Sequence, residues 1–131
     1  MQISKEADYA LRAVLYLSRL DDSQQIATSK IAAQQRIPSS FLAKIVARLS
    51  SAGIIRTSRG ARGGISLARP GEQVSVLEVI EAIDGPIAVN ACVLHPGECH
   101  FGETCTLHDI FCEAQEILVG KLKQTTFDQL I

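Results

Sequence analysis

The residues with the most distinctive chemistry are four cysteines in the second half of the chain. Cys92, Cys99, Cys105 and Cys112 are separated by six, five and six residues. In a chain without an export signal, clustered cysteines bind a metal or sense redox state more often than they form disulfides. The first three lie in a stretch without hydrophobic periodicity, which can fold three thiolates around one centre. The sequence therefore predicts a thiolate site there.

A histidine supplies a fourth donor for this site. His108 follows Cys105 by three residues, a spacing that places both on one face of a helix. Three cysteines and one histidine suit either a zinc ion or an iron–sulfur cluster, and cysteines alone can form a thiol switch. We interpret Cys112 as a buried residue that packs like an apolar one. Spacing alone leaves the three chemistries open.

The charges are strongly segregated along the chain. Residues 1–70 contain 11 Lys or Arg and 4 Asp or Glu, a balance of +7, whereas residues 71–131 contain 2 and 10, a balance of −8. Residues 23–71 hold eight basic residues and no acidic one. This pattern indicates that the first half contacts a polyanion. A basic face without a partner, on a protein-interaction module that does not bind DNA, is the alternative.

Hydrophobic periodicity predicts how the basic half folds. We expect a helix over 6–20, ended by Asp21-Asp22-Ser23, a second over 28–36 with Thr28 as its N-cap, and a third that Ser39 or Ser40 caps and Gly53 follows. The β-branched runs 54–57 and 65–67 flank a glycine-rich turn and predict a β-hairpin. Two helices joined by a tight turn and followed by a hairpin form a winged helix-turn-helix.

In this arrangement the third helix enters the major groove of DNA with its N-terminal residues, and arginines at the hairpin tip reach a narrow groove. Lys44 suits a phosphate better than a base, and Phe41 suits either a thymine methyl or the core. The residues expected to contact DNA are Thr28, Ser39, Ser40, Phe41, Lys44, Arg59 and Arg62.

The remainder of the chain predicts two more helices. Ser75 and Glu78 form a capping box ahead of a helix that Gly85-Pro86 ends. A long helix begins near Thr106, and an apolar stripe runs along it: Leu107, Ile110, Phe111, Ala114, Ile117, Leu118 and Leu122. Thr125 or Thr126 caps a final turn. The stripe is too apolar for a solvated helix, so we expect a symmetric homodimer.

Composition excludes several classes of protein. The 131 residues are 47% hydrophobic and 21% charged, which suits one folded domain. The longest apolar run, Ala13–Leu17, is too short to span a membrane, and no signal-peptide apolar region follows the start, so we expect a cytoplasmic protein. No catalytic constellation is present, so an enzyme is not expected. The fold class expected is mainly α with a small β-hairpin.

Longer motifs resemble a known family. They are residues 1–17, the Ser-Arg-Gly-Ala-Arg-Gly-Gly-Ile run at 58–65, the Val-Leu-Glu-Val-Ile-Glu-Ala-Ile-Asp-Gly segment at 76–85, and the three-cysteine loop. Together they resemble the bacterial winged-helix iron–sulfur transcription regulators typified by IscR and NsrR, over nearly the whole chain. Two features depart from that pattern: a first cysteine gap of six residues where those members usually have five, and the additional Cys112.

The resemblance implies a dimeric regulator with one cluster per subunit, held by Cys92, Cys99 and Cys105. IscR-like members complete a [2Fe–2S] cluster with a histidine, which His108 matches. NsrR-like members complete a [4Fe–4S] cluster with an acid of the partner subunit, which Asp8 matches. The resemblance also divides the chain into three parts: a winged helix-turn-helix DNA-binding region (1–85), a cysteine loop for the cluster (86–105), and a C-terminal dimerisation helix with its turn (106–131).

Taken together, the sequence predicts a transcription regulator, acting as a repressor, whose binding to operator DNA is controlled by an iron–sulfur cluster sensing iron–sulfur status, redox state or nitric oxide. The same regulator with a zinc site or a thiol switch in the loop is the first alternative. A protein-interaction module without DNA binding is the second.

Overall fold

The computed structural model describes residues 2–21 and 24–131. Asp22 and Ser23, expected to help end the first helix, lie outside these described residues. Six helices and two strands follow one another in the order α1 (Lys5–Ser18), α2 (Thr28–Gln35), α3 (Ser39–Ser51), β1 (Ile55–Ser58), β2 (Gly64–Leu67), α4 (Val76–Asp84), α5 (Ala91–Leu94) and α6 (Thr106–Gln124). The predicted class, mainly helical with one hairpin, is confirmed.

The hairpin is antiparallel and is fixed to the segment that precedes α2. Ile55 pairs with Leu67 and Ser58 with Gly64. Ile26 then forms a bridge to Ile65, with N···O distances of 3.0 and 2.8 Å in the two directions. A Cβ built on Gly64 would lie 2.4 Å from the carbonyl oxygen of Ile26, so this close approach requires glycine. The base of the wing is thereby anchored to the helix-turn-helix.

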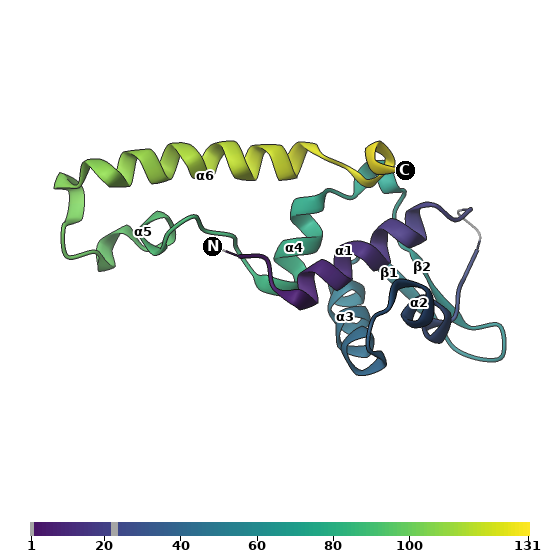
Figure 1. Cartoon of the computed structure of the whole chain (residues 1–131). Coiled ribbons are helices and arrows are strands. Elements are labelled where there is room, and N and C mark those ends of the chain that lie inside the picture. The colour runs from purple at the N-terminus through teal and green to yellow at the C-terminus, as the bar shows by residue number, and fades with distance from the viewer. Residues whose placement is uncertain (1, 22–23) are drawn as a thin grey trace.

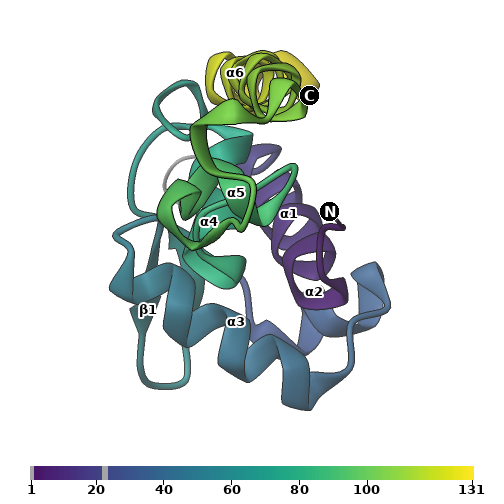
Figure 2. The same cartoon turned by 90° about the vertical axis from the view of Figure 1, so that its left-hand side faces the viewer.

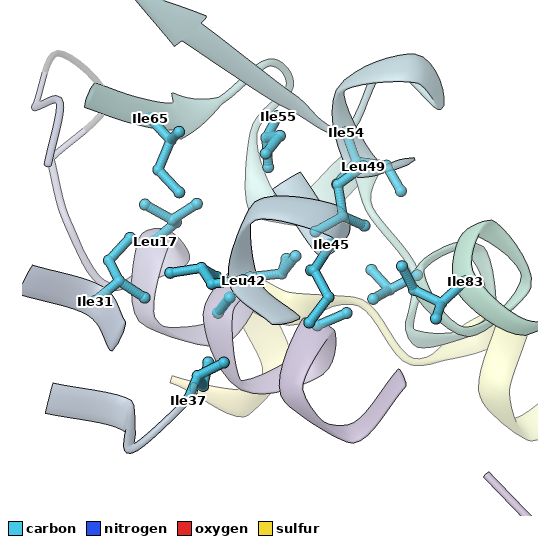
Figure 3. Packing of buried hydrophobic residues seen from close by; sticks show 14 of the residues in the cluster. Leu17, Ile31, Ile37, Leu42, Ile45, Leu49, Ile54, Ile55, Ile65 and Ile83 are labelled. Atoms are coloured by element: carbon cyan, nitrogen blue, oxygen red, sulfur yellow. The ribbon is translucent and has the colours of Figure 1, made fainter. Parts of the chain in front are cut away.

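The core lies where α1, α3, α4 and the hairpin meet (Figure 3). Alanines of α1 at positions 7, 10 and 13 are fully or almost fully buried, and their small side chains let neighbouring helices approach closely. Leu42, Ile45 and Leu49 form the buried stripe of α3, as their spacing predicts. Val46, which the same spacing predicts to be in this stripe, is half-buried instead and faces the hollow between α3 and the hairpin.

Helix α6 stands apart from this core (Figure 1). The segment after α4 runs outward beneath it, turns, and α6 returns along the full length of that segment. None of the 19 residues of α6 is fully buried. Within the described residues, no helix has the length and apolar character needed to cross a membrane.

The helix starts were predicted only in part. Ser75 caps α4 as expected, because its hydroxyl accepts a hydrogen bond from the Glu78 amide at 3.1 Å. By contrast α2 starts with Ala27 as its N-cap and α3 with Pro38, so Thr28 and Ser39 are already helical. Their side chains are therefore not used as caps.

The fit of the wing predicts the effect of one methyl group. Gly64→Ala should lower the free energy of unfolding by about 1–3 kcal/mol, because the new Cβ collides with the backbone of Ile26. Gly120→Ala is the matched control: nothing lies within 4 Å of a Cβ there, and alanine favours the helix. Urea unfolding measures both, and equal midpoints would contradict the close approach.

Candidate functional site

The residues predicted to contact DNA lie on one side of the molecule. In the end-on view, α3 and the loop of the hairpin lie on the side opposite α6 (Figure 2). Every one of them is exposed, namely Thr28, Ser39, Ser40, Phe41, Lys44, Arg59 and Arg62. The hollow between α3 and the hairpin is lined by Val46 of α3, by Ser58 of the hairpin and by Thr28 at the start of α2. This side combines the expected hydroxyl and cationic groups.

The helix N-termini on this side are open, whereas those of α1 and α4 are closed. Ser4 and Ser75 cap α1 and α4 through their side chains, and both helices carry acidic residues in the first turn. Helices α2 and α3 have no side-chain cap bond and no acidic residue in the first turn. Their free N–H groups carry partial positive charge, which favours phosphate oxygens. The two ends therefore suit DNA backbone contacts.

Phe41 differs from the other residues of this group. Its side chain is 36% exposed, and its ring packs at 6.0 Å from the ring of Tyr9 with an interplanar angle of 59°. Lys5 in turn lies 5.1 Å from the centre of the Tyr9 ring. Phe41 thus contacts Tyr9 of α1 and is still partly exposed, which is intermediate between the two roles that its sequence position suggested.

The three cysteines of the predicted site line one cavity. Cys92 is on α5, Cys99 follows the 3-10 turn Pro96–Glu98, and Cys105 is the N-cap of α6. They surround a volume of about 540 Å³ together with His108 in the first turn of α6. The aromatic rings of Phe101 and Phe111 also contribute to the wall. The structure therefore brings together the four donors that lie close in sequence.

These donors surround the cavity without converging on one point. Among the described residues, no three His, Cys, Asp or Glu side chains are placed to hold one metal ion. The cavity is many times larger than one water molecule, which occupies about 30 Å³. All four cysteines are unpaired thiols and half-buried. Thiolates spread around a cavity of this size fit a group with several metal atoms better than a single ion.

Cys112 lies outside the cavity wall but contacts it through His108. Its Sγ is 3.4 Å from Nε2 of His108, one helical turn earlier. The expectation that Cys112 is fully buried is wrong, since it is half-buried. Within the described residues no position of α6 is fully buried, so Cys112 shares the partial exposure of the whole helix.

Asp8, the other candidate for a fourth ligand, lies on α1 rather than in the cavity. Its carboxylate accepts a hydrogen bond from Nε of Arg12 at 3.2 Å and is 3.9 Å from Nζ of Lys5. Within one chain it does not line the cysteine cavity. It can take part only if a second subunit brings it there.

Sequence reasoning missed the polar side chains that join distant segments. Arg48 on α3 donates to the carbonyl oxygen of Ile83 at the end of α4 at 2.9 Å. Gln115 on α6 forms hydrogen bonds with the backbone of Ile87 and Val89. Both residues are helical and polar, so nothing in their local pattern distinguishes them from solvent-exposed neighbours. Only the fold reveals their partners.

Comparisons with known proteins agree with this arrangement. Residues 3–131 match the Rrf2 family, described as an iron-dependent transcriptional regulator. A Mycobacterium tuberculosis protein named as an HTH-type transcriptional regulator is 33% identical over 126 residues, which cover 96% of this chain and 78% of that protein.

Two solved structures share the fold. CymR, the global cysteine regulator of B. subtilis, superposes with a TM-score of 0.86 at 22% identity, covering 99% of this chain and 95% of that one. IscR of T. potens superposes with a TM-score of 0.79 at 19% identity, covering 99% of this chain and 85% of that one. The match over nearly the whole chain, together with the winged helix-turn-helix, shows that this chain belongs to the Rrf2 family of DNA-binding transcriptional regulators and is not an enzyme.

Proposed function

We propose that this chain is a homodimeric, cytoplasmic regulator, acting as a repressor, whose binding to operator DNA is controlled by an iron–sulfur cluster. Cys92, Cys99 and Cys105 would hold the cluster, with His108 as the fourth ligand. The observation that carries the proposal is that these four side chains line one cavity. Asp8 of the partner subunit is the competing fourth ligand.

The chemistry of the donor set supports the cluster. Thiolates are soft anionic donors that retain iron, and a cluster with one non-cysteine ligand is easier to lose or oxidise. Such lability would supply the sensing chemistry. Cys105 is at the positive end of the α6 dipole, which favours an anionic donor at this position. Phe101 and Phe111 make part of the cavity wall apolar.

The structure offers a physical connection from the cysteine site to the DNA-binding unit. Helix α6 carries Cys105 and His108 at its start and returns to the winged unit at its end. There the Val76 amide donates to the Thr125 carbonyl at 2.9 Å, and the Phe127 amide donates to the Val74 carbonyl at 3.2 Å. A change at the cavity that reorients α6 would therefore reach α4 directly.

The exposed face of α6 supports the homodimer. Leu107, Ile110, Ala114 and Ile117 follow a spacing of three and four residues, and Ile117 is 74% exposed. Phe111, Leu118 and Leu122 lie along the adjoining side of the same apolar stripe and are half-buried. Pairing two copies through the exposed stripe would bury it and place two α3 helices about 34 Å apart, one turn of DNA.

The first test of the proposal concerns DNA binding. Arg59→Ala and Lys44→Ala should each weaken operator binding by roughly 1–3 kcal/mol if the side chain contacts a base. If the side chain binds a phosphate instead, the slope of the logarithm of the binding constant against the logarithm of the salt concentration should fall in magnitude by about 1. Lys123→Ala, an exposed cation on α6, is the control and should change neither. Fluorescence anisotropy across a salt series measures both quantities. Binding indifferent to salt and to both substitutions would exclude this surface.

The dimer is tested by charge on the stripe. Ile117→Glu should give folded monomers that bind DNA poorly, because two carboxylates would face each other across the two-fold axis. Lys123→Glu places the same side chain on the other side of α6 and should leave the dimer intact. Sedimentation at micromolar concentration distinguishes the two. A monomeric wild-type protein would contradict the assembly.

The cluster is tested by anaerobic purification with iron and sulfide analysis. Cys92→Ala, Cys99→Ala and Cys105→Ala should each abolish cluster retention, whereas Cys112→Ala should retain it. His108→Ala should change the visible absorption spectrum and shorten the cluster lifetime, and Asp8→Ala should change neither; the reverse result would identify Asp8 of the partner subunit as the ligand. Equal cluster content in Cys105→Ala and wild type would contradict the ligand set, and a colourless protein would favour zinc or a thiol switch.

A further inference from the structure

Gln115 joins the cysteine segment to α6 through two hydrogen bonds. Its Nε2 donates to the carbonyl oxygen of Ile87 at 2.6 Å, and its Oε1 accepts from the amide of Val89 at 2.8 Å. The side-chain amide thus uses its donor and its acceptor on the backbone of two nearby residues, as an adjacent strand would. Gln115, Ile87 and Val89 are all half-buried, so water competes weakly for these bonds.

The clamped segment leads directly to the first cysteine. Val89 is followed by Asn90, the N-cap of α5, and Cys92 is the second residue of that helix. The side-chain amide of Asn90 lies 3.5 Å from Sγ of Cys92. Fixing Val89 therefore fixes where α5 begins and on which side of α6 the Cys92 thiol lies.

Gln115 itself lies on the helix that carries two other donors of the site, Cys105 and His108. Gln115 follows His108 by seven residues, two helical turns, so both side chains leave the same face of α6. Cys105 is the N-cap of the same helix. Gln115 thus fixes the position of Cys92 relative to α6, the helix that carries His108 and has Cys105 as its N-cap.

The clamp acts close to the start of the segment. Gly85 ends α4 with φ 76° and ψ −168°, a conformation that is essentially restricted to glycine. Ile87 and Val89 lie two and four residues beyond Gly85, and Cys92 follows Val89 by three residues. Holding the start of the loop in place restricts the space that its first cysteine can explore.

We propose that Gln115 is a positioning residue of the cysteine site: by clamping Ile87 and Val89 to α6, it holds the Cys92 thiol on the wall of the cavity that Cys105 also lines. The inference rests on the proposed function only for its consequence, cluster retention. The clamp itself is a property of the metal-free protein.

The test is therefore made first without any cluster. In protein that keeps only Cys92 and Cys105, with Cys99→Ser and Cys112→Ser, dibromobimane bridges the two thiols at a rate that depends on how often they meet. Gln115→Leu removes both hydrogen bonds and should slow bridging about fivefold to tenfold relative to this parent. Gln115→Glu keeps the acceptor for the Val89 amide and loses the donor to Ile87, so it should be intermediate. Glu116→Gln changes the neighbouring residue, which is exposed, and its bridging rate should match that of the parent.

Amide hydrogen exchange in the otherwise wild-type sequence provides the second readout. Exchange at Val89 should accelerate by a similar factor in Gln115→Leu while amides of α1 and α3 keep their protection, which shows that the fold is intact. Unchanged bridging and unchanged Val89 exchange in Gln115→Leu would overturn the clamp. Should that variant fail to fold, the same comparison on Gln115→Glu decides the matter.

Cluster loading then separates the two proposals. In anaerobically reconstituted protein, Gln115→Leu should shorten the cluster half-life at least threefold. If wild-type protein binds no cluster, the proposed function fails while bridging and exchange still decide the clamp. If wild type and Gln115→Leu lose the cluster at the same rate, Gln115 has no positioning role.

Discussion

The relation between the two halves of this molecule depends on one buried ring, that of Phe127. It is 1% exposed and belongs to the same core as α1 and α3, although it comes from the turn after α6. No residue of α6 itself is fully buried, so Phe127 anchors the C-terminal end of this helix in the core, while Gln115 holds its middle against the cysteine segment. Burial of a phenylalanine side chain contributes about 1.5–3 kcal/mol, enough to keep this end of α6 docked. At the distant end, Cys105 and His108 are only half-buried.

Helix α4 is the element that the DNA-binding unit and the cysteine site share. Its N-cap Ser75 pairs with Thr126, and its last residue Asp84 precedes the glycine at which the cysteine segment begins. Arg48 of α3 holds the carbonyl of Ile83, and Ser4 of α1 donates to Asp84. The helix that carries the predicted base contacts and the segment that carries the thiols therefore meet at the same end of α4. A structural change at the cysteine site could therefore reach α3 through this end of α4.

The sequence predicted the parts of the fold that depend on local chemistry. The stripe Leu42, Ile45 and Leu49, the Ser75 cap and the hairpin follow from periodicity and turn residues, and the structure confirms them. The cysteines were found because their residue type is uncommon. Three of them line one cavity, and the thiolate site stays a prediction.

What the sequence did not reveal depends on partners far apart in the chain. Helix α5 has only four residues, too few for a hydrophobic period to show. In the sequence Ile26 is an isolated apolar residue, and only the structure shows that it pairs with Ile65. Gln115 reads as one polar residue on a helix, since its partners precede it by 26 and 28 residues. The caps of α2 and α3 were mispredicted because threonine and serine occupy the first turn instead.

The separation of charge has a consequence for how the protein finds DNA. The basic residues concentrate in the half that forms α3 and the hairpin, and the acidic excess follows in the half that includes α6, on the opposite side of the molecule (Figure 2). A chain with a net charge of only −1 therefore carries a large electric dipole. In the field of a phosphate backbone a dipole experiences a torque, so the molecule turns before it touches. Collisions in which α6 meets the DNA first are disfavoured by repulsion, and a larger fraction of diffusive encounters begins with the recognition face turned inward.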